Sequence, residues 1–259
     1  MESALEAFLT TSVFAFMLTF VRLGTAIMIM PGVGDSFVSA RVRLLIAVSL
    51  SFALFPLTMP FIPDPLPSTF GLFVLILMEG LIGFFFGAMA RIFMSALDTA
   101  GMGISISSGL ANAQVFNPSL ASQGSIIGAL LSMAGVTFMF VTDMHHLLFI
   151  GILESYQLFP LGAIPDTGSM AELMARAVSA SFTVGIKIAA PFLILSILIY
   201  TGMGILGRLM PQIQVFILAL PVQIMLSWVL LMIVVSAGLL YWLSQFEQGM
   251  VFFLRTAGG

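Results

Sequence analysis

The chain has 259 residues, of which 60% are hydrophobic and only 7% are charged, with a formal net charge of −3 at pH 7. An average soluble domain carries roughly 25% charged residues, so this composition predicts an all-α membrane protein of several spanning helices, with no room for a soluble domain. The net negative charge excludes a basic surface for nucleic acid, and the lack of cysteine excludes disulfides and thiolate chemistry.

Six long apolar segments follow one another along the chain, and each is predicted to be a helix able to cross a membrane. They cover residues 8–30, 44–62, 70–97, 125–153, 177–206 and 215–243. The connections between them are mostly rich in proline or glycine, residues that end helices or favour turns. We therefore expect about six hydrophobic helical segments arranged as kinked hairpins.

A central segment, residues 99–124, differs from its surroundings. It has no charged residue, and half of its residues are Gly, Ala or Ser. Its glycines lower helix propensity, and Pro118 is incompatible with a helix interior, so the segment is predicted to be a Gly/Ser-rich loop. Non-helical backbone at membrane depth persists only where it is buried in protein or lines a water-filled space.

Three interpretations of the central segment remain open. It is a plain connecting loop, a broken helix that builds a transporter's binding site, or a loop that plugs or lines a pore. In the third case Met102, Val115 and Phe116 supply an apolar seal, and small or amide residues supply close packing and hydrogen bonds. The candidate pore residues are Met102, Gly109, Asn112, Gln114, Val115, Phe116, Asn117 and Pro118.

Charged residues inside the apolar segments need partners, because each costs about 2.5–3.5 kcal/mol at the centre of a membrane helix. They pair with one another between helices, pair with other subunits, or line a polar path. Arg91 and Asp98 are spaced to share one helix face. The residues predicted to lie in buried or inter-subunit charge contacts are Arg22, Arg41, Arg43, Glu79, Arg91, Lys187 and Arg208.

Two patterns resemble a metal site and a catalytic site, but each lacks a feature that its chemistry needs. His145 and His146 are adjacent and on a helix diverge by about 100°, so with Asp143 they are expected near a membrane face or protein contact rather than around a metal. Gly32-Val33-Gly34-Asp35 matches the GxGD pattern of intramembrane aspartyl proteases, which need a second, facing aspartate. Asp143 is the only intramembrane candidate for that second aspartate. The sequence therefore predicts no catalytic residue, no metal and no cofactor.

Two motifs carry a resemblance to a known family. Residues 208–216 read RLMPQIQVF and are followed by Pro221, and residues 31–43 read PGVGDSFVSARVR. Together with Glu79, Gly80 and Gly83, they make the whole chain resemble the FliR/SpaR/YscT family of type III export-gate proteins, in its flagellar branch. The chain departs from that family's pattern at Gln214 and Asn117, where the family often has Asn and Asp.

The resemblance implies a non-enzymatic subunit of the flagellar protein-export gate in the bacterial cytoplasmic membrane, at the basal body. The implied partners are several copies each of FliP and FliQ, then FlhB and FlhA, and unfolded flagellar subunits pass through the shared pore. Residues 1–176 correspond to a FliP-like part and residues 177–259 to a FliQ-like helical hairpin with its tail. A rigid turn is predicted at Met210, Pro211, Gln212 and Phe216. The alternative is a secondary transporter for a small solute.

Overall fold

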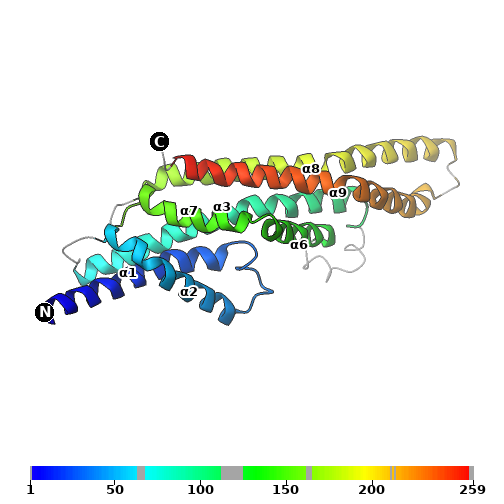
Figure 1. Cartoon of the computed structure of the whole chain (residues 1–259). Coiled ribbons are helices and arrows are strands. Elements are labelled where there is room, and N and C mark those ends of the chain that lie inside the picture. The colour runs from blue at the N-terminus through cyan, green and yellow to red at the C-terminus, as the bar shows by residue number, and fades with distance from the viewer. Residues whose placement is uncertain are drawn as a thin grey trace. The chain divides into compact units, whose positions relative to one another are not determined.

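The computed structural model describes residues 2–62, 68–111, 125–161, 165–210, 212 and 214–256 (Figure 1). Every regular element in these ranges is a helix. The elements are α1 (Glu2–Ile29), α2 (Ala40–Thr58), the short 3₁₀ helix η1 (Met59–Phe61), α3 (Thr69–Ser107), α6 (Ile126–Val141), α7 (Met144–Leu158), α8 (Thr167–Leu209) and α9 (Val215–Thr256).

The prediction of an all-α membrane protein with about six apolar helical segments is confirmed. Among the described residues, five helices are long and apolar enough to cross a membrane, and a sixth span is formed if α6 and α7 count as one. These two helices meet at a bend of 75°. The bend contains neither glycine nor proline. It is made at Asp143, which has a left-handed backbone with φ of 58°.

The helix α3 extends beyond the predicted end of the third segment and reaches Ser107, inside the predicted central loop. It continues through Gly101 and Gly103 because tertiary packing overrides their low helix propensity. A Cβ atom at Gly101 would lie 2.1 Å from Cα of Gly128 on α6, so only glycine lets the two helices approach this closely.

The helix α8 begins at Thr167, ahead of the predicted start at residue 177. Asp166 precedes it and acts as an N-cap. Its carboxylate accepts hydrogen bonds from the backbone N–H of Gly168 at 3.0 Å and from Oγ of Ser169 at 2.6 Å. Pro191 in α8 and Pro221 in α9 both lie inside helices, as apolar membrane helices tolerate.

The chain divides into two compact units that are not continuous in sequence. One unit contains Met1–Ile92, Asp143–Ala177 and Gln248–Gly259, and the other contains Phe93–Thr142 and Val178–Glu247. The division into residues 1–176 and 177–259 that the family resemblance implies follows the chain instead, and it stays a prediction.

The first unit is held together by packing of α1 against α2, α3 and α7. Phe16 of α1 contacts Phe52 and Phe55 of α2 edge-on, with ring centroids 6.4 and 6.2 Å apart. A Cβ at Gly83 of α3 would lie 2.1 Å from the carbonyl oxygen of Arg22, so α1 and α3 touch backbone to backbone at this level. This close crossing brings the Arg22 side chain next to α3.

The second unit is organised around Trp242 of α9, which is only 1% exposed. Its indole Nε1 donates a hydrogen bond of 3.0 Å to the carbonyl oxygen of Phe93 on α3. Its ring also packs on Phe246 at a centroid distance of 5.3 Å. A buried tryptophan with its N–H satisfied contributes a large apolar area without an orphaned donor.

Candidate functional site

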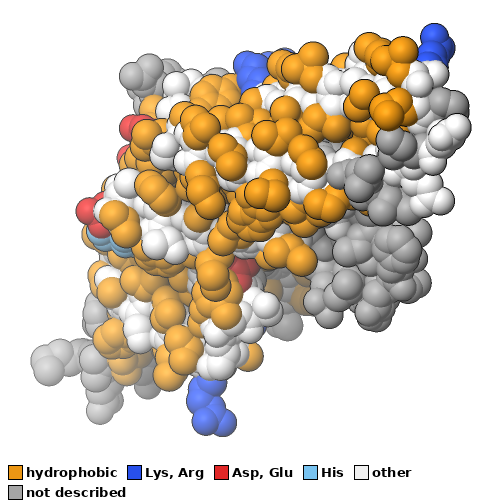
Figure 2. All heavy atoms as spheres, turned by 90° about the vertical axis from the view of Figure 1, so that its right-hand side faces the viewer, with side chains coloured by type: hydrophobic (Ala, Val, Ile, Leu, Met, Phe, Trp, Pro, Cys, Tyr) orange, Lys and Arg blue, Asp and Glu red, His pale blue; other side chains and the backbone are white. Residues whose placement is uncertain are grey.

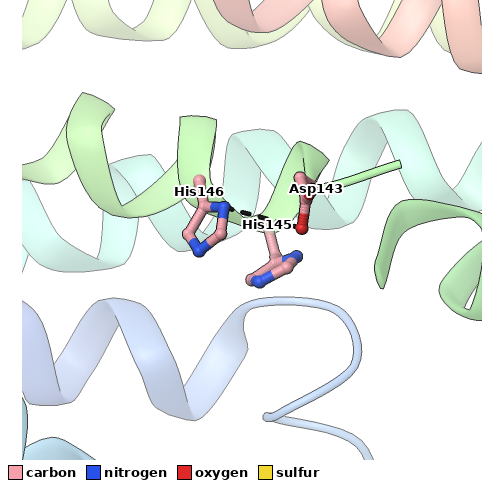
Figure 3. A group of neighbouring side chains, drawn as sticks. All are labelled: Asp143, His145 and His146. Carbon is pink, nitrogen blue, oxygen red and sulfur yellow. Dashed lines mark ion pairs between the residues drawn. The ribbon is translucent and has the colours of Figure 1, made fainter. Parts of the chain in front are cut away.

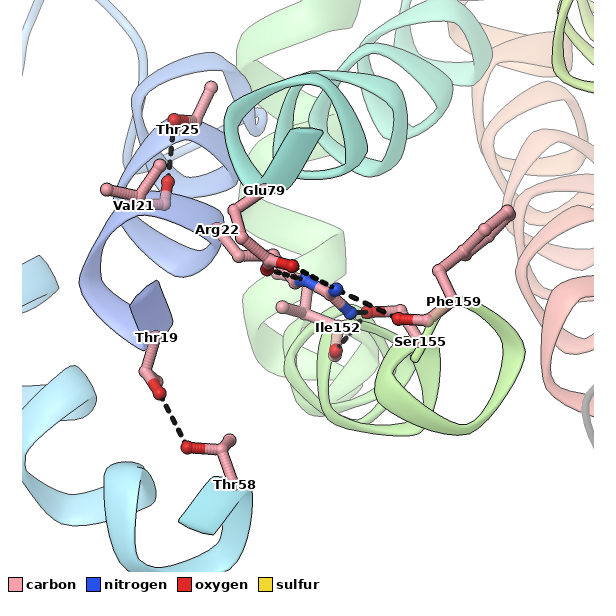
Figure 4. Close-up of polar contacts among 9 residues, drawn as sticks. All are labelled: Thr19, Val21, Arg22, Thr25, Thr58, Glu79, Ile152, Ser155 and Phe159. Carbon is pink, nitrogen blue, oxygen red and sulfur yellow. Dashed lines mark hydrogen bonds and ion pairs between the residues drawn. The ribbon is translucent and has the colours of Figure 1, made fainter. Parts of the chain in front are cut away.

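A buried ion pair lies at the centre of the first unit. Arg22 of α1 donates from Nε to Oε2 of Glu79 on α3 at 2.5 Å, and from Nη2 to Oε1 at 2.9 Å (Figure 4). The two side chains are 0% and 1% exposed. The bidentate geometry matches the planar guanidinium to the carboxylate and gives the strongest form of this contact.

The helix α7 completes the surroundings of Arg22. Oγ of Ser155 and the carbonyl oxygen of Phe159 each accept a hydrogen bond of 3.0 Å from the guanidinium, as Figure 4 shows. The guanidinium carbon lies 3.8 Å from the ring centroid of Tyr156, within range of a cation–π contact. Three helices therefore share one internal charge, and Arg22 and Glu79 are each other's partners within a single chain.

A second ion pair ties α3 to the connection between α1 and α2. Arg91 donates from Nη1 to Oδ1 of Asp35 at 2.5 Å and from Nε to the carbonyl oxygen of Ile29 at 3.0 Å. Oδ2 of Asp35 accepts from the backbone N–H of Gly32 at 2.7 Å. This pair is partly exposed, unlike the pair of Arg22.

Arg91 does not pair with Asp98, the acid that shares its helix face in the sequence. Asp98 instead accepts a hydrogen bond of 2.5 Å from Oγ of Ser132 on α6. The structure also does not bring together the two aspartates that an intramembrane aspartyl protease needs, because Asp35 contacts Arg91 and Gly32 whereas Asp143 contacts His146. The two aspartates do not form the carboxylate pair that shares one proton.

Hydrogen bonds fasten both ends of the central segment. Oγ of Ser125 lies 2.7 Å from Oγ of Ser105 and donates to the carbonyl oxygen of Gly101 at 2.9 Å. Ser125 also caps α6 by accepting from the backbone N–H of Gly128 at 2.9 Å. Gln223 of α9 donates from Nε2 to the carbonyl oxygen of Ser107 at 2.6 Å, which satisfies the last turn of α3.

Two of the predicted pore residues lie in the described part of the chain. Met102 is on α3 and is 44% exposed. Gly109 has φ of 79° and follows the end of α3, where a left-handed glycine commonly ends a helix. The remaining six predicted pore residues lie outside the described residues: Asn112, Gln114, Val115, Phe116, Asn117 and Pro118.

The other predicted charges lie nearer the surface. Arg41 is exposed, and Arg43 is half-buried and donates from Nε to the carbonyl oxygen of Val38 at 3.1 Å. Lys187 is exposed on α8, with Nζ 5.8 Å from the ring centroid of Tyr241 on α9. Arg208 is exposed in the last turn of α8.

The predicted turn between α8 and α9 is described only in part. Met210 is 51% exposed, and Gln212 is exposed as well. Pro211 and the side chain of Phe216 lie outside what the structure describes. The rigidity of this turn therefore stays a prediction.

The structure brings Asp143, His145 and His146 together, against the expectation that the two histidines diverge. One possible ligand atom from each residue lies within 4.8 Å of the other two. Figure 3 shows the three side chains on one side of the first turn of α7. The helical angle between adjacent residues is a poor guide here because the pair sits at a break, where no preceding turn of α7 restricts the rings.

Comparison with known proteins places the whole chain in one family. Residues 13–249 match the family described as bacterial export proteins, family 1. The chain is 35% identical to "Flagellar biosynthetic protein FliR" of Caulobacter vibrioides, over 94% of this chain and 98% of the relative. It is 29% identical to the protein of that name from Bacillus subtilis, over 86% of each chain.

A virulence-type relative is also similar. "Yop proteins translocation protein T" of Yersinia pestis is 30% identical over 63% of this chain and 64% of its own length. The family match covers both motifs on which the resemblance rested, residues 31–43 and 208–216. The chain belongs to the bacterial export proteins, family 1, the FliR/SpaR/YscT family.

Proposed function

We propose that this protein is a subunit of the flagellar type III export gate in the bacterial cytoplasmic membrane, where it forms and seals part of the pore for unfolded flagellar proteins. The observation that carries the proposal is the similarity along 94% of the chain to a protein named for flagellar biosynthesis. The relative named for Yop protein translocation supports a role in protein export rather than solute transport. The role is structural and gating, without catalysis.

The surface of α8 supports assembly with other membrane proteins. Large apolar side chains are exposed from Val178, at 53%, to Leu209, at 72%. These two residues lie about 46 Å apart along the helix at a rise of about 1.5 Å per residue. The hydrocarbon core is only about 30 Å thick, so lipid tails would cover the whole stretch only at a tilt of about 50°, beyond the usual range of up to about 40°. Partner proteins cover the remainder.

Two further features of α8 favour protein partners over lipid. Lys187 is exposed between apolar residues, where a lipid contact costs about 2.5–3.5 kcal/mol at the centre of a bilayer. A Cβ at Gly202, Gly204 or Gly207 would meet no atom within 4 Å. Exposed glycines on a membrane helix let another helix approach closely. Figure 2 shows hydrophobic side chains over much of the viewed surface, with few charged groups among them.

On this proposal the partners are FliP and FliQ, in several copies each, together with FlhB and FlhA. The helices α8 and α9 form the FliQ-like hairpin, and the preceding residues form the FliP-like part. Residues 109–118 of the central segment plug or line the closed pore. Its ends are fastened through Ser105, Ser125 and Gln223, which favours a loop that is anchored at its base.

Co-purification tests the assembly. The chain expressed alone is expected to be unstable or polydisperse in detergent, and co-expression with the FliP-like and FliQ-like proteins of the same bacterium is expected to yield one complex. The rival function, a small-solute transporter, predicts a monodisperse protein from the single chain that binds a solute. Recovery of such a protein would refute the export-gate proposal.

Shortening the central segment tests the seal. Deletion within residues 112–117 is expected to make the assembled complex conduct small ions, while the complex still assembles and carries wild-type amounts of this chain. A deletion of the same size within residues 63–67, in the connection between η1 and α3, serves as the control. Wild-type conductance together with normal export in the first variant would refute the sealing role.

A further inference from the structure

The bend between α6 and α7 carries an aspartate in an unusual state. Asp143 occupies the N-cap position of α7 with a left-handed backbone, and its side chain caps no backbone N–H. An N-cap aspartate ordinarily accepts from the N–H two or three residues later. Here Oδ1 lies 3.7 Å from Nδ1 of His146 instead. The carboxylate is therefore directed at an imidazole rather than at the end of its own helix.

His145 lies in the same group of side chains. The rings of His145 and His146 lie 4.1 Å apart between centroids, tilted by 37°. One ligand atom from each of the three residues lies within 4.8 Å of the others. All three project from the same side of the ribbon in Figure 3. Two imidazoles and one carboxylate thus converge at the break between two helices.

We propose that Asp143, His145 and His146 form a binding site for a divalent transition metal of the zinc type. Two histidine nitrogens and one carboxylate oxygen are the protein ligands of open zinc sites, in which water or another ligand takes the fourth position. Imidazole ligands favour zinc, nickel and copper over magnesium and calcium, which prefer oxygen ligands throughout. One carboxylate with two neutral imidazoles leaves a net positive charge of one on the occupied site.

Closing the site requires the ligand atoms to move closer together. Tetrahedral zinc with bonds of about 2.0–2.1 Å places neighbouring ligand atoms about 3.3 Å apart, so the widest present separation of 4.8 Å has to shorten by roughly 1.5 Å. The His146 and Asp143 side chains are 64% and 75% exposed, so packing within the chain leaves room for them to rotate. A bound metal would join the N-cap residue Asp143 to the first turn of α7.

The composition of the chain limits where imidazole-dependent metal binding can occur. The chain contains two histidines and no cysteine, so imidazole-dependent metal binding by this subunit has one possible origin. The full-length chain is purified from membranes in the assembly it forms, with a tag that contains no histidine. It is stripped with a chelator and titrated with Zn²⁺, and bound zinc is measured by equilibrium dialysis.

The expected result is one additional Zn²⁺ per copy of this chain relative to the double variant His145→Ala, His146→Ala. His146→Ala and Asp143→Asn alone are each expected to weaken binding at least about tenfold, as loss of even an outer contact commonly does at such sites. Asp166→Asn alters an exposed N-cap aspartate of another helix and should leave zinc binding unchanged. Equal zinc binding by wild type and the double variant would overturn the proposal.

A measurement on the unmodified chain covers the case in which a variant does not fold. Cu²⁺ bound to the wild-type protein is expected to show electron paramagnetic resonance with superhyperfine splitting from two imidazole nitrogens. A spectrum with no nitrogen coupling at one equivalent of Cu²⁺ would also overturn the proposal. Neither result depends on export, so failure of the metal site is distinguishable from failure of the export-gate function.

Discussion

Removing the negative charge of Glu79 while keeping its shape is expected to destabilise the first unit strongly. In Glu79→Gln, the guanidinium of Arg22 loses a bidentate carboxylate at 2.5 and 2.9 Å. Breaking a buried ion pair from one side typically costs about 3–5 kcal/mol, because a charge is left buried without compensation. Arginine cannot escape this cost by losing its proton.

The remaining contacts place the expected loss near the lower end of that range. Arg22 keeps hydrogen bonds of 3.0 Å to Ser155 and to the carbonyl oxygen of Phe159, and the ring of Tyr156 stays 3.8 Å away. Two of the four polar contacts of the guanidinium therefore survive. We expect Glu79→Gln to lower the free energy of unfolding by about 3 kcal/mol.

The chain offers a surface ion pair as a control. Arg176 donates to Glu172 one helical turn away at 2.5 Å, with side chains 73% and 64% exposed. Exposed pairs of this kind contribute about 0.3–0.5 kcal/mol, so Glu172→Gln should be nearly silent. The contrast between the two variants compares a buried, bidentate pair between helices with an exposed, single contact within one helix.

The assay is unfolding of the detergent-solubilised protein by increasing amounts of a denaturing detergent, followed by circular dichroism. The apolar replacement Arg22→Met, Glu79→Leu is included, because a buried pair replaced by apolar residues is often neutral or stabilising. We expect it to recover much of the stability lost in Glu79→Gln. A loss in Glu79→Gln no larger than in Glu172→Gln would refute the reasoning, as would a double variant Arg22→Met, Glu79→Leu that is no more stable than Glu79→Gln.

Two other predictions concern helix packing and capping. Gly101→Ala should destabilise the second unit by about 1–3 kcal/mol, because its Cβ would lie 2.1 Å from Gly128. Gly202→Ala places its Cβ where no atom lies within 4 Å, so it should be neutral or slightly stabilising in the chain alone. Equal thermal stability of the two variants would contradict this. Hydrogen bonds from Ser169 hold the pKa of the Asp166 carboxyl below its usual range. The stabilisation that these hydrogen bonds give is complete above the unfolded-state pKa of Asp166 and is lost as pH falls through the lowered, folded-state pKa. Asp166→Asn should therefore remove this acid sensitivity from hydrogen exchange in the first turn of α8. An unchanged pH dependence of the exchange would count against this prediction.

Hydropathy and charge predicted the spans and identified the charges that need partners, but they did not predict which groups would meet. Arg22 and Glu79 were both recognised as costly inside an apolar segment, yet they lie in different helices. Only the crossing of α1 and α3 at Gly83 brings them together. The sequence did not identify Ser155 as a partner of Arg22, because a serine in an apolar helix ordinarily hydrogen-bonds to the backbone of its own helix.

Sequence proximity was misleading where the fold supplied a better partner. Asp98 shares a helix face with Arg91, but the connection after α1 places Asp35 within 2.5 Å of the guanidinium. Low helix propensity at Gly101 was misleading for a related reason. Glycine weakens an isolated helix, but in α3 its missing side chain is what allows α6 to approach.

The two kinds of charge in the apolar helices have different consequences for assembly. Arg22 and Glu79 are paired within one chain, so the first unit satisfies its buried charges without help from another protein. Lys187 is exposed on α8, and its contact with Tyr241 is a long cation–π contact of 5.8 Å rather than an ion pair. On the proposed function, Lys187 therefore marks a face of α8 that meets protein or water and not lipid. The exposed glycines farther along the same helix permit a closely packed partner, so α8 is the first surface on which to look for contacts with the neighbouring gate subunits.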